Sequence, residues 1–438
     1  MPAPKLQGPQ LDVRGDTLAV TWTQPPVRMV FRNCVRAKWG SVDADVIVES
    51  LGSKSLGKRL HGPARISINN TSHQTGLARA MSDRVALSEA TNLALWSTVV
   101  AQSCSVVCER WDIGEPFVLL HTVPPERTSE LVQGLIPLGQ TSIICGDGES
   151  AKSLVALSLA LSLATGVPMP SGLAPAAVCP VLYLDWETDA QEQRYRMWRL
   201  ATGYFGQDSL PEVHYRAMVK PLAEDIQRIR DYVSENKILF VVVDSLGPAA
   251  GEMESTDSAM RVMHALRQLG AGVTKLVVAH VTKASAEGNG HYRPIGSAFF
   301  YNLARSVWEC RRADDDRADS IRVGLFCVKS NAGQRGHPIG LEFAFDTGEA
   351  DSILIFAHSI RDDADLVKHA PLKTRIYHLL ATNWRAMTVE QLAEELEQKP
   401  QVVRARLSDG NVFVRVSPPE QRTGVLWGLK SNAGDNDD

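Results

Sequence analysis

One stretch constrains the fold of this chain more than any other: a β-branched run ending at Gly146, a glycine-bearing loop, and an Ala/Leu-rich segment from Lys152. This order is typical of a phosphate-binding loop, in which backbone N–H groups and a helix N-terminus surround phosphate oxygens. Lys152 is expected to reach the β- and γ-phosphates of ATP, and the Ser153 hydroxyl to hold Mg²⁺. The residues predicted to bind the nucleotide are Gly146, Asp147, Gly148, Glu149, Ser150, Ala151, Lys152 and Ser153.

Ala151 departs from the usual pattern of such loops, G-x-x-x-x-G-K-[ST], which has glycine at this position. If the position needs a positive φ angle, alanine costs about 1 kcal/mol. If the position already lies in the helical region, alanine is harmless. The departure therefore bears on nucleotide affinity rather than on the fold.

Three further apolar runs end in polar residues of the kind that surround a bound nucleotide: Glu187, Asp244 and His280. The carboxyl ends of neighbouring parallel strands meet at one edge of a sheet. Glu187 is therefore placed to polarise the attacking water, and Asp244 to order Mg²⁺ through water. His280 is placed to sense the γ-phosphate. The alternatives are a helix-start acid for Glu187 and structural roles for the other two.

Two other segments combine basic residues with glycine. Residues 284–293 are rich in Gly, Ser and Asn, which predicts either a mobile loop facing the channel of a ring or an ordinary surface loop. Lys329 and Arg335 follow an apolar strand, where they suit contact with a phosphate across a subunit interface. A solubilising hairpin turn is the alternative for this pair.

Composition excludes several classes of protein. The net charge of −4 gives no general affinity for polyanions, so any contact with nucleic acid must come from local patches. The 7 cysteines are scattered without a CxxC pair, which predicts reduced thiols and a cytoplasmic location. The N-terminus has neither signal nor transit features, and no apolar run reaches the ~18 residues of a membrane span. We expect no membrane contact.

The 438 residues are expected to form three folded parts and a tail. Residues 1–125 predict a small α+β or mostly helical module, of which α+β is favoured, and residues 126–365 predict an α/β ATPase domain. Residues 366–430 predict three helices and a β-ribbon, which together make a winged helix-turn-helix. Residues 431–438 are acidic and are expected to be disordered.

The predicted winged helix carries a local basic excess, with 10 Lys plus Arg against 6 Asp plus Glu over residues 366–430. Thr388 and Gln391 form the pattern of a capping box at one of its helices. Gln401, Arg404 and Arg406 lie on the helix that would enter a DNA groove. DNA binding and a purely protein contact remain two alternatives.

With these motifs in hand, residues 130–360 resemble the RecA-like ATPase family. The closer resemblance is to the branch that contains the plasmid hexameric helicase RepA and bacterial or phage AAA family ATPases. It implies a doubly wound, mainly parallel sheet flanked by helices, and a hexameric ring with ATP between subunits. The resembling pieces are residues 146–153, 182–187, 240–246, 277–283 and 296–308.

The resemblance also implies residue roles. By it, Glu187 is the catalytic carboxylate, His280 the γ-phosphate sensor and Arg305 the arginine finger that acts on a neighbouring subunit. Lys329 and Arg335 occupy the stretch where related ring helicases place further trans-acting basic residues. Their Lys-x5-Arg spacing is longer than the expected Lys-x-Arg, so which of the two acts stays open.

Two functional hypotheses follow. The first is a Mg²⁺-dependent ATPase that forms a homo-oligomeric ring, a hexamer by the resemblance, and acts on DNA. Single-stranded DNA is favoured, and the role would be that of a helicase or translocase working with replication or recombination proteins. The second is an ATP-switched DNA-binding or scaffolding protein without motor activity. The two differ in turnover, because a motor hydrolyses ATP continually and faster with DNA.

Overall fold

The computed structural model describes residues 6, 9–14, 17–36, 41–52, 58–85, 92–113, 129–206, 210–251, 255–281, 294, 296, 298–314, 319–331, 336–348, 351–383, 385–408, 410 and 412–430. The chain divides into two compact units, residues 1–126 and 127–438. Among the helices described, none is both long and apolar enough to cross a membrane. The predicted acidic tail, residues 431–438, lies outside the described residues.

The first unit is an antiparallel sheet with strand order β1-β2-β3-β4-β5, packed against two helices. Trp22 and Trp96 are buried in its core, and the Trp22 indole donates a hydrogen bond to Ser103 Oγ at 2.9 Å. The strands are β1 (Gln10–Arg14), β2 (Thr17–Trp22), β3 (Val27–Arg36), β4 (Val42–Ser50) and β5 (Arg59–Ser67), and the helices are α1 (Thr71–Arg84) and α2 (Asn92–Ile113).

The second unit contains a nine-stranded sheet with the order β10-β9-β11-β12-β8-β13-β14-β15-β16. Strands β10 to β13 in this order run parallel, and β14 to β16 continue the sheet antiparallel. The strands are β8 (Thr141–Gly146), β9 (Val181–Asp185), β10 (Val213–Ala217), β11 (Phe240–Asp244), β12 (Thr274–His280), β13 (Ser306–Arg312), β14 (Ser320–Ser330), β15 (Ile339–Asp346) and β16 (Ser352–Ala357), preceded by β6 (Glu130–Val132) and β7 (Ile136–Pro137).

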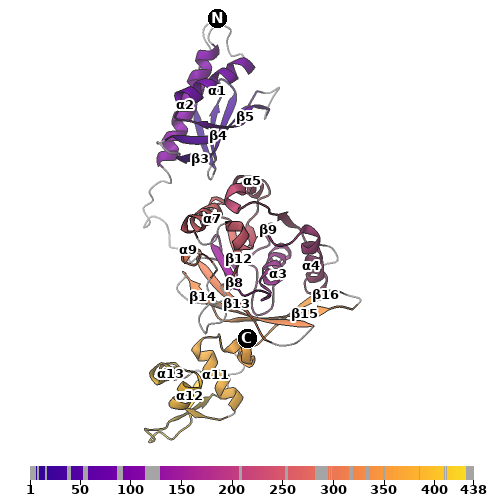
Figure 1. The fold of residues 1–438 in the computed structure, drawn as a ribbon, viewed down its shortest axis with the longest axis vertical. Coiled ribbons are helices and arrows are strands. Elements are labelled where there is room, and N and C mark those ends of the chain that lie inside the picture. Colours follow the sequence, from indigo (N-terminus) through magenta and orange to yellow (C-terminus); the bar gives the residue numbers. More distant parts are fainter. Residues whose placement is uncertain are drawn as a thin grey trace. The chain divides into compact units, whose positions relative to one another are not determined.

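Helices cover both faces of the parallel strands (Figure 1). Successive side chains of a strand point to opposite faces, so Ile144 packs with α3 and α4 while Ile143 and Cys145 pack with the helices of the other face. Burial on both faces explains why these strands are almost continuously apolar. The helices are α3 (Lys152–Thr165) and α4 (Ala190–Gly203) on one face, and α5 (Leu222–Glu235), α6 (Leu246–Ala250), α7 (Thr256–Gln268) and α9 (Ala298–Leu303) on the other.

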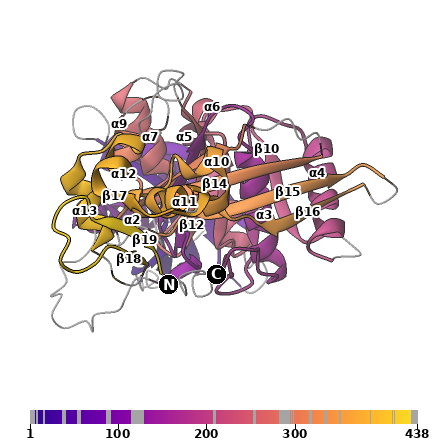
Figure 2. The ribbon, with the colours of Figure 1, turned by 90° about the horizontal axis from the view of Figure 1, so that it is seen from below.

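Helix α4 lies beside the β15–β16 hairpin (Figure 1 and Figure 2). A Cβ added at Gly203 would come within 2.4 Å of the Ile353 carbonyl oxygen, so only glycine allows this approach. Arg199 Nε lies 3.0 Å from Asp351 Oδ1, and the Tyr195 hydroxyl donates to Asp351 Oδ2 at 2.5 Å. These contacts join α4 to the far end of the sheet.

The C-terminal part combines three helices with a small antiparallel sheet of order β17-β19-β18. The predicted capping box is confirmed: Gln391 N donates to Thr388 Oγ1 at 3.2 Å, and Thr388 N donates to Gln391 Oε1 at 2.9 Å. The elements are η3 (Ile360–Asp362), α10 (Ala364–Val367), α11 (Leu372–Asn383), β17 (Met387–Thr388), α12 (Val389–Glu395), α13 (Pro400–Leu407), β18 (Phe413–Arg415) and β19 (Leu426–Leu429).

Candidate active site

The loop after β8 packs tightly on the neighbouring strand β13. A Cβ added at Gly146 would lie 2.4 Å from the Cys310 carbonyl oxygen and 2.6 Å from Ser150 Oγ, so no larger residue fits. The Cys310 thiol also donates to the Ser150 carbonyl oxygen at 3.0 Å. The loop is therefore held in a curl directly before α3.

Of the two backbone conformations considered for Ala151, a positive φ angle and the helical region, the structure has the positive φ angle. Its φ is 61° and its ψ is 20°, which is the left-handed conformation that favours glycine. The alanine at this position is accommodated with backbone strain rather than in the helical region.

Replacing Ala151 with glycine is expected to raise the free energy of unfolding by about 0.5–1 kcal/mol. The relief of left-handed strain, about 1–2 kcal/mol, exceeds the extra chain entropy that glycine loses on folding. Urea unfolding of the full chain measures the change. Ala164→Gly, inside α3, is the matched control and should lower stability by about 1 kcal/mol. A loss of stability in Ala151→Gly would contradict the strain.

Lys152 is the first residue of α3 and is 5% exposed. Its ammonium donates to the Asp147 carbonyl oxygen and to Ser150 Oγ, the latter at 3.2 Å. Burial lowers the pKa of Lys152, an effect that nearby acids and Cys310 oppose. The ammonium thus lies in the curl of the loop, where a phosphate group would be recognised by charge and by the N–H groups at the start of the helix.

Asp244 ends β11 with 3% of its surface exposed. Its Oδ2 accepts a 2.5 Å hydrogen bond from the Tyr183 hydroxyl, whereas Oδ1 is buried with no hydrogen-bond partner among the described residues. Burial raises the pKa of Asp244 to about 6, while Tyr183 and the nearby Ser153 hydroxyl oppose the rise. An unpaired carboxylate oxygen on a side chain that lies near a serine hydroxyl fits Mg²⁺, which binds through oxygen ligands and water.

Glu187 and His280 are in direct contact. His280 Nε2 lies 3.2 Å from Glu187 Oε1, and the Ser245 hydroxyl donates to the same oxygen. The His280 hydrogen bond, reinforced by that from Ser245, lowers the pKa of Glu187 to about 2 against the opposing effect of burial. Glu187 is therefore an anion at neutral pH that can accept a proton or a hydrogen bond from water.

Asp185 is a residue whose role the sequence analysis missed. Its carboxylate accepts from Glu187 N at 2.9 Å, Thr188 N at 3.0 Å and Thr188 Oγ1 at 2.6 Å. Trp186 N donates to the Asp244 carbonyl oxygen at 2.7 Å. The turn that carries Glu187 is thereby attached to β11. The sequence does carry a signal for this role: Asp185 lies two residues before Glu187, and an aspartate at that spacing is typical of an Asx turn.

A family model matches the part of the chain that contains these residues. Residues 114–286 match the family model of an AAA domain, and this span contains the loop after β8, Glu187, Asp244 and His280. Among solved structures, the KaiC-like protein PH0186 from Pyrococcus horikoshii OT3 is similar at 16% identity, with a TM-score of 0.35, over 53% of this chain and 99% of that chain. The comparison with curated proteins gave no match.

Arg305 lies at the opposite edge of the ATPase sheet from its own P-loop. It is exposed, and its backbone N–H donates to the Thr141 carbonyl oxygen at 2.9 Å, where β8 begins. Gly146 ends the same strand, and a strand rises about 3.3 Å per residue, so the two ends are about 16 Å apart. The backbone of Arg305 thus lies at the other end of β8 from the site to which Lys152 belongs.

Lys329 lies at the same edge as Arg305, but its ammonium is engaged at the end of α9. Burial and the nearby Arg305 lower its pKa. Arg335 and residues 284–293 lie outside the described residues. The spacing left open whether Lys329 or Arg335 acts in trans, and the Lys329 ammonium is bound by carbonyl oxygens of its own chain. Its acceptors are the carbonyl oxygens of Tyr301, Asn302 and Ala304, at 2.8, 2.7 and 2.8 Å.

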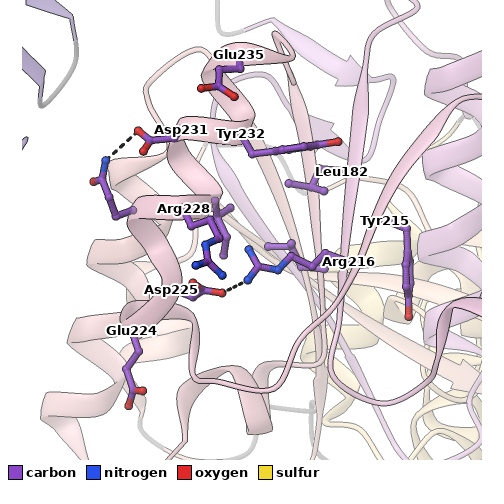
Figure 3. Close-up of a pocket in the computed structure, with 12 residues that line it drawn as sticks. Leu182, Tyr215, Arg216, Glu224, Asp225, Arg228, Asp231, Tyr232 and Glu235 are labelled. Carbon is purple, nitrogen blue, oxygen red and sulfur yellow. Dashed lines mark hydrogen bonds and ion pairs between the residues drawn. The ribbon is translucent and has the colours of Figure 1, made fainter. Parts of the chain in front are cut away.

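A cavity of about 740 Å³ lies elsewhere, between α5 and strands β9 and β10 (Figure 3). Leu182 and Leu184 form part of its wall, and the ion pair of Arg216 with Asp225 lies beside it. None of its lining residues belongs to the predicted ATP site. This cavity and the candidate ATP site are thus separate features of the domain.

The pKa of Asp244 predicts how pH affects Mg²⁺-dependent nucleotide binding. A protonated carboxyl cannot pair with the cation, so the Mg²⁺ contribution to ADP affinity should fall about tenfold per pH unit below pH 6. Titration of a fluorescent ADP analogue with and without Mg²⁺ between pH 5 and 8 measures this. Affinity without Mg²⁺ is the internal control. A Mg²⁺ contribution that stays constant down to pH 5 would contradict the raised pKa.

Proposed function

We propose that the chain is a Mg²⁺-dependent, ATP-hydrolysing ring ATPase that acts on DNA in the cytoplasm, as a helicase or translocase in replication or recombination. ATP would lie between subunits of a homo-oligomer, a hexamer by family resemblance. The observation that carries this proposal is the division of the candidate catalytic groups between two edges of one sheet. Lys152, Glu187, Asp244 and His280 lie at one edge, and Arg305 lies at the other.

The chemistry assigned to this chain's residues is positioning and charge neutralisation. Lys152 would hold the phosphates, while Ser153 and Asp244 would hold Mg²⁺, which neutralises phosphate charge when bound. Glu187 would orient the attacking water and draw its proton. His280, hydrogen-bonded to Glu187 Oε1 at 3.2 Å, is positioned to relate the state of the γ-phosphate to the orientation of that carboxylate.

The distance between Arg305 and its own P-loop supports assembly. A finger residue must touch the transferring phosphate, and an arginine side chain cannot bridge about 16 Å of strand. The Arg305 of one subunit could, however, complete the site of the next in a head-to-tail ring. The two-edge arrangement therefore favours an interfacial ATP site.

The C-terminal part supports a DNA contact. Its three helices and small sheet have the elements of a winged helix, and Arg404 and Arg406 are exposed on α13. Arg404 lies 3.7 Å from Glu390 in an exposed pair, which holds the arginine only weakly. Both arginines are thus available to phosphate groups.

A second candidate, an ATP-switched scaffolding or DNA-binding protein without motor activity, is favoured by one observation. Val402 on α13 and Val414 on β18 are 42% and 40% exposed. Apolar side chains on the helix and strand that would face DNA suit a protein partner better than a phosphate backbone.

Steady-state ATP hydrolysis by the full chain, with and without single-stranded DNA, separates the two candidates. A motor should turn over ATP several-fold faster with DNA, and an Arg404→Ala/Arg406→Ala variant tests whether α13 supplies that contact. Lys368→Ala, an exposed lysine before α11, is a matched charge control. Slow turnover that DNA does not change would refute the motor and favour the switch.

A further inference from the structure

Two carboxylates stand side by side at the ATP edge of the sheet, and a tyrosine hydroxyl contacts each. Asp185 on β9 and Asp244 on β11 are paired in register. The Tyr183 hydroxyl donates to Asp244 Oδ2 at 2.5 Å, and the Tyr215 hydroxyl donates to Asp185 Oδ2 at 3.3 Å. The other oxygen of Asp185 accepts hydrogen bonds from the backbone N–H groups of Glu187 and Thr188. Asp244, in contrast, has one oxygen, Oδ1, without a hydrogen-bond partner among the described residues.

The ring and the hydroxyl of Tyr183 are both held in place, so the hydroxyl can orient the Asp244 carboxylate. Its side chain is fully buried in the core between the sheet and the α3–α4 face. A phenol has a single O–H donor, and the structure gives that donor to Asp244. Burial and the neighbouring Asp244 raise the pKa of Tyr183, and an interaction with the Gln193 side chain on α4 opposes the rise. Both the ring and the hydroxyl are therefore fixed from several sides.

We propose that Tyr183 is a positioning residue that holds Asp244 Oδ2 so that Oδ1 is presented to the Mg²⁺ of the bound nucleotide. This inference rests on the proposed ATPase function and deepens it. The carboxylate of an aspartate can rotate about its last bond, and a donor on one oxygen selects one orientation. Outer partners of this kind orient groups that act on a metal.

The location of the hydroxyl argues against a role in packing alone. Phenylalanine would fill the same core volume without the requirement for a buried hydrogen bond. The hydroxyl instead points to the only Asp244 oxygen that has a hydrogen-bond partner among the described residues. The orientation that this hydrogen bond selects also sets the position of the other oxygen, Oδ1, which is buried and has no hydrogen-bond partner among the described residues.

The test is the Mg²⁺ dependence of nucleotide binding by Tyr183→Phe in the full chain. We expect the Mg²⁺ concentration that gives half of the affinity gain for a fluorescent ADP analogue to rise about tenfold or more. ADP affinity without Mg²⁺ should stay within twofold of wild type. Tyr204→Phe is the matched control, because its hydroxyl donates to the Pro168 carbonyl oxygen at 2.9 Å, away from both carboxylates. An unchanged Mg²⁺ dependence in folded Tyr183→Phe would overturn the proposal.

A double-mutant cycle with Asp244→Asn distinguishes positioning from general destabilisation. If Tyr183 acts through Asp244, Tyr183→Phe should add no further Mg²⁺ defect in the Asp244→Asn background. Additive defects would overturn the proposal even if Tyr183→Phe is unstable by itself. Wild type that binds no ADP analogue would refute the proposed function instead, so the two failures are distinguishable.

Discussion

Replacing Glu187 with glutamine is expected to lower the rate of ATP hydrolysis about 100-fold or more while leaving ATP binding within a few-fold of wild type. General-base and water-orienting groups contribute about 10²- to 10⁴-fold. Glutamine keeps the shape of the side chain and its hydrogen bond to Ser245, but it lacks the negative charge that Glu187 carries at neutral pH. Phosphate release under steady-state conditions gives the rate, and an ATP analogue that is not hydrolysed gives the affinity.

Glu192→Gln is the matched control for this variant. Glu192 lies on α4, five residues beyond Glu187, and its carboxylate pairs with Arg196 at 2.9 Å on the surface. Its loss should leave hydrolysis unchanged, because an exposed pair contributes little. Full activity in Glu187→Gln would show that another residue activates the water. Loss of ATP binding would show that Glu187 holds the nucleotide instead.

Replacing Arg305 with alanine is expected to reduce ATP hydrolysis about 10³-fold or more, the range measured when an arginine finger is supplied or removed. ATP binding by an isolated subunit should not change, because Arg305 lies about 16 Å of strand away from its own P-loop. Arg228→Ala removes another exposed arginine, on α5, and should have no such effect. Equal loss in both variants would exclude a specific role for Arg305.

Mixing variants tests whether Arg305 acts between subunits. Arg305→Ala subunits retain Glu187, and Glu187→Gln subunits retain Arg305. In a mixed ring, an interface that takes Glu187 from one and Arg305 from the other is intact, so activity should reappear although each variant alone is inactive. If the rings are shown to exchange subunits and ATP hydrolysis still does not recover at any mixing ratio, Arg305 does not act on a neighbouring subunit.

The sequence predicts the ends of the ATPase strands well because each is a long apolar run followed at once by a polar residue. Asp244 and His280 follow this pattern, Gly146 ends a similar apolar run where the glycine-bearing loop begins, and the structure gathers all three at one edge. The elements β10 and α5 were not predicted, although Leu222, Ile226, Ile229 and Val233 recur at helical spacing and are buried on one face of α5. The segment carries none of the motif residues that mark the nucleotide site, so its helical periodicity is its only signal.

Contacts between strands account for most of what the sequence could not predict about the site. The pairing of Tyr183 with Asp244 depends on β9 lying next to β11, which no local pattern encodes. The position of Arg305 depends on β13 pairing with β8, and only that register shows which edge the arginine occupies. For Ala151, the sequence left two backbone conformations open, and the loop curl against Cys310 accompanies the left-handed one.

The anchoring of α4 has a consequence for long-range effects on the site. This helix starts three residues after Glu187, and Tyr195 and Arg199 tie it to Asp351, more than 150 residues later in the chain. The placement of Glu187 is therefore determined at two ends, by the Asp185 turn and by the last hairpin of the sheet. Sequence changes around Asp351 can alter the orientation of the candidate base without any contact to nucleotide, so variants in that hairpin belong among those that tune hydrolysis.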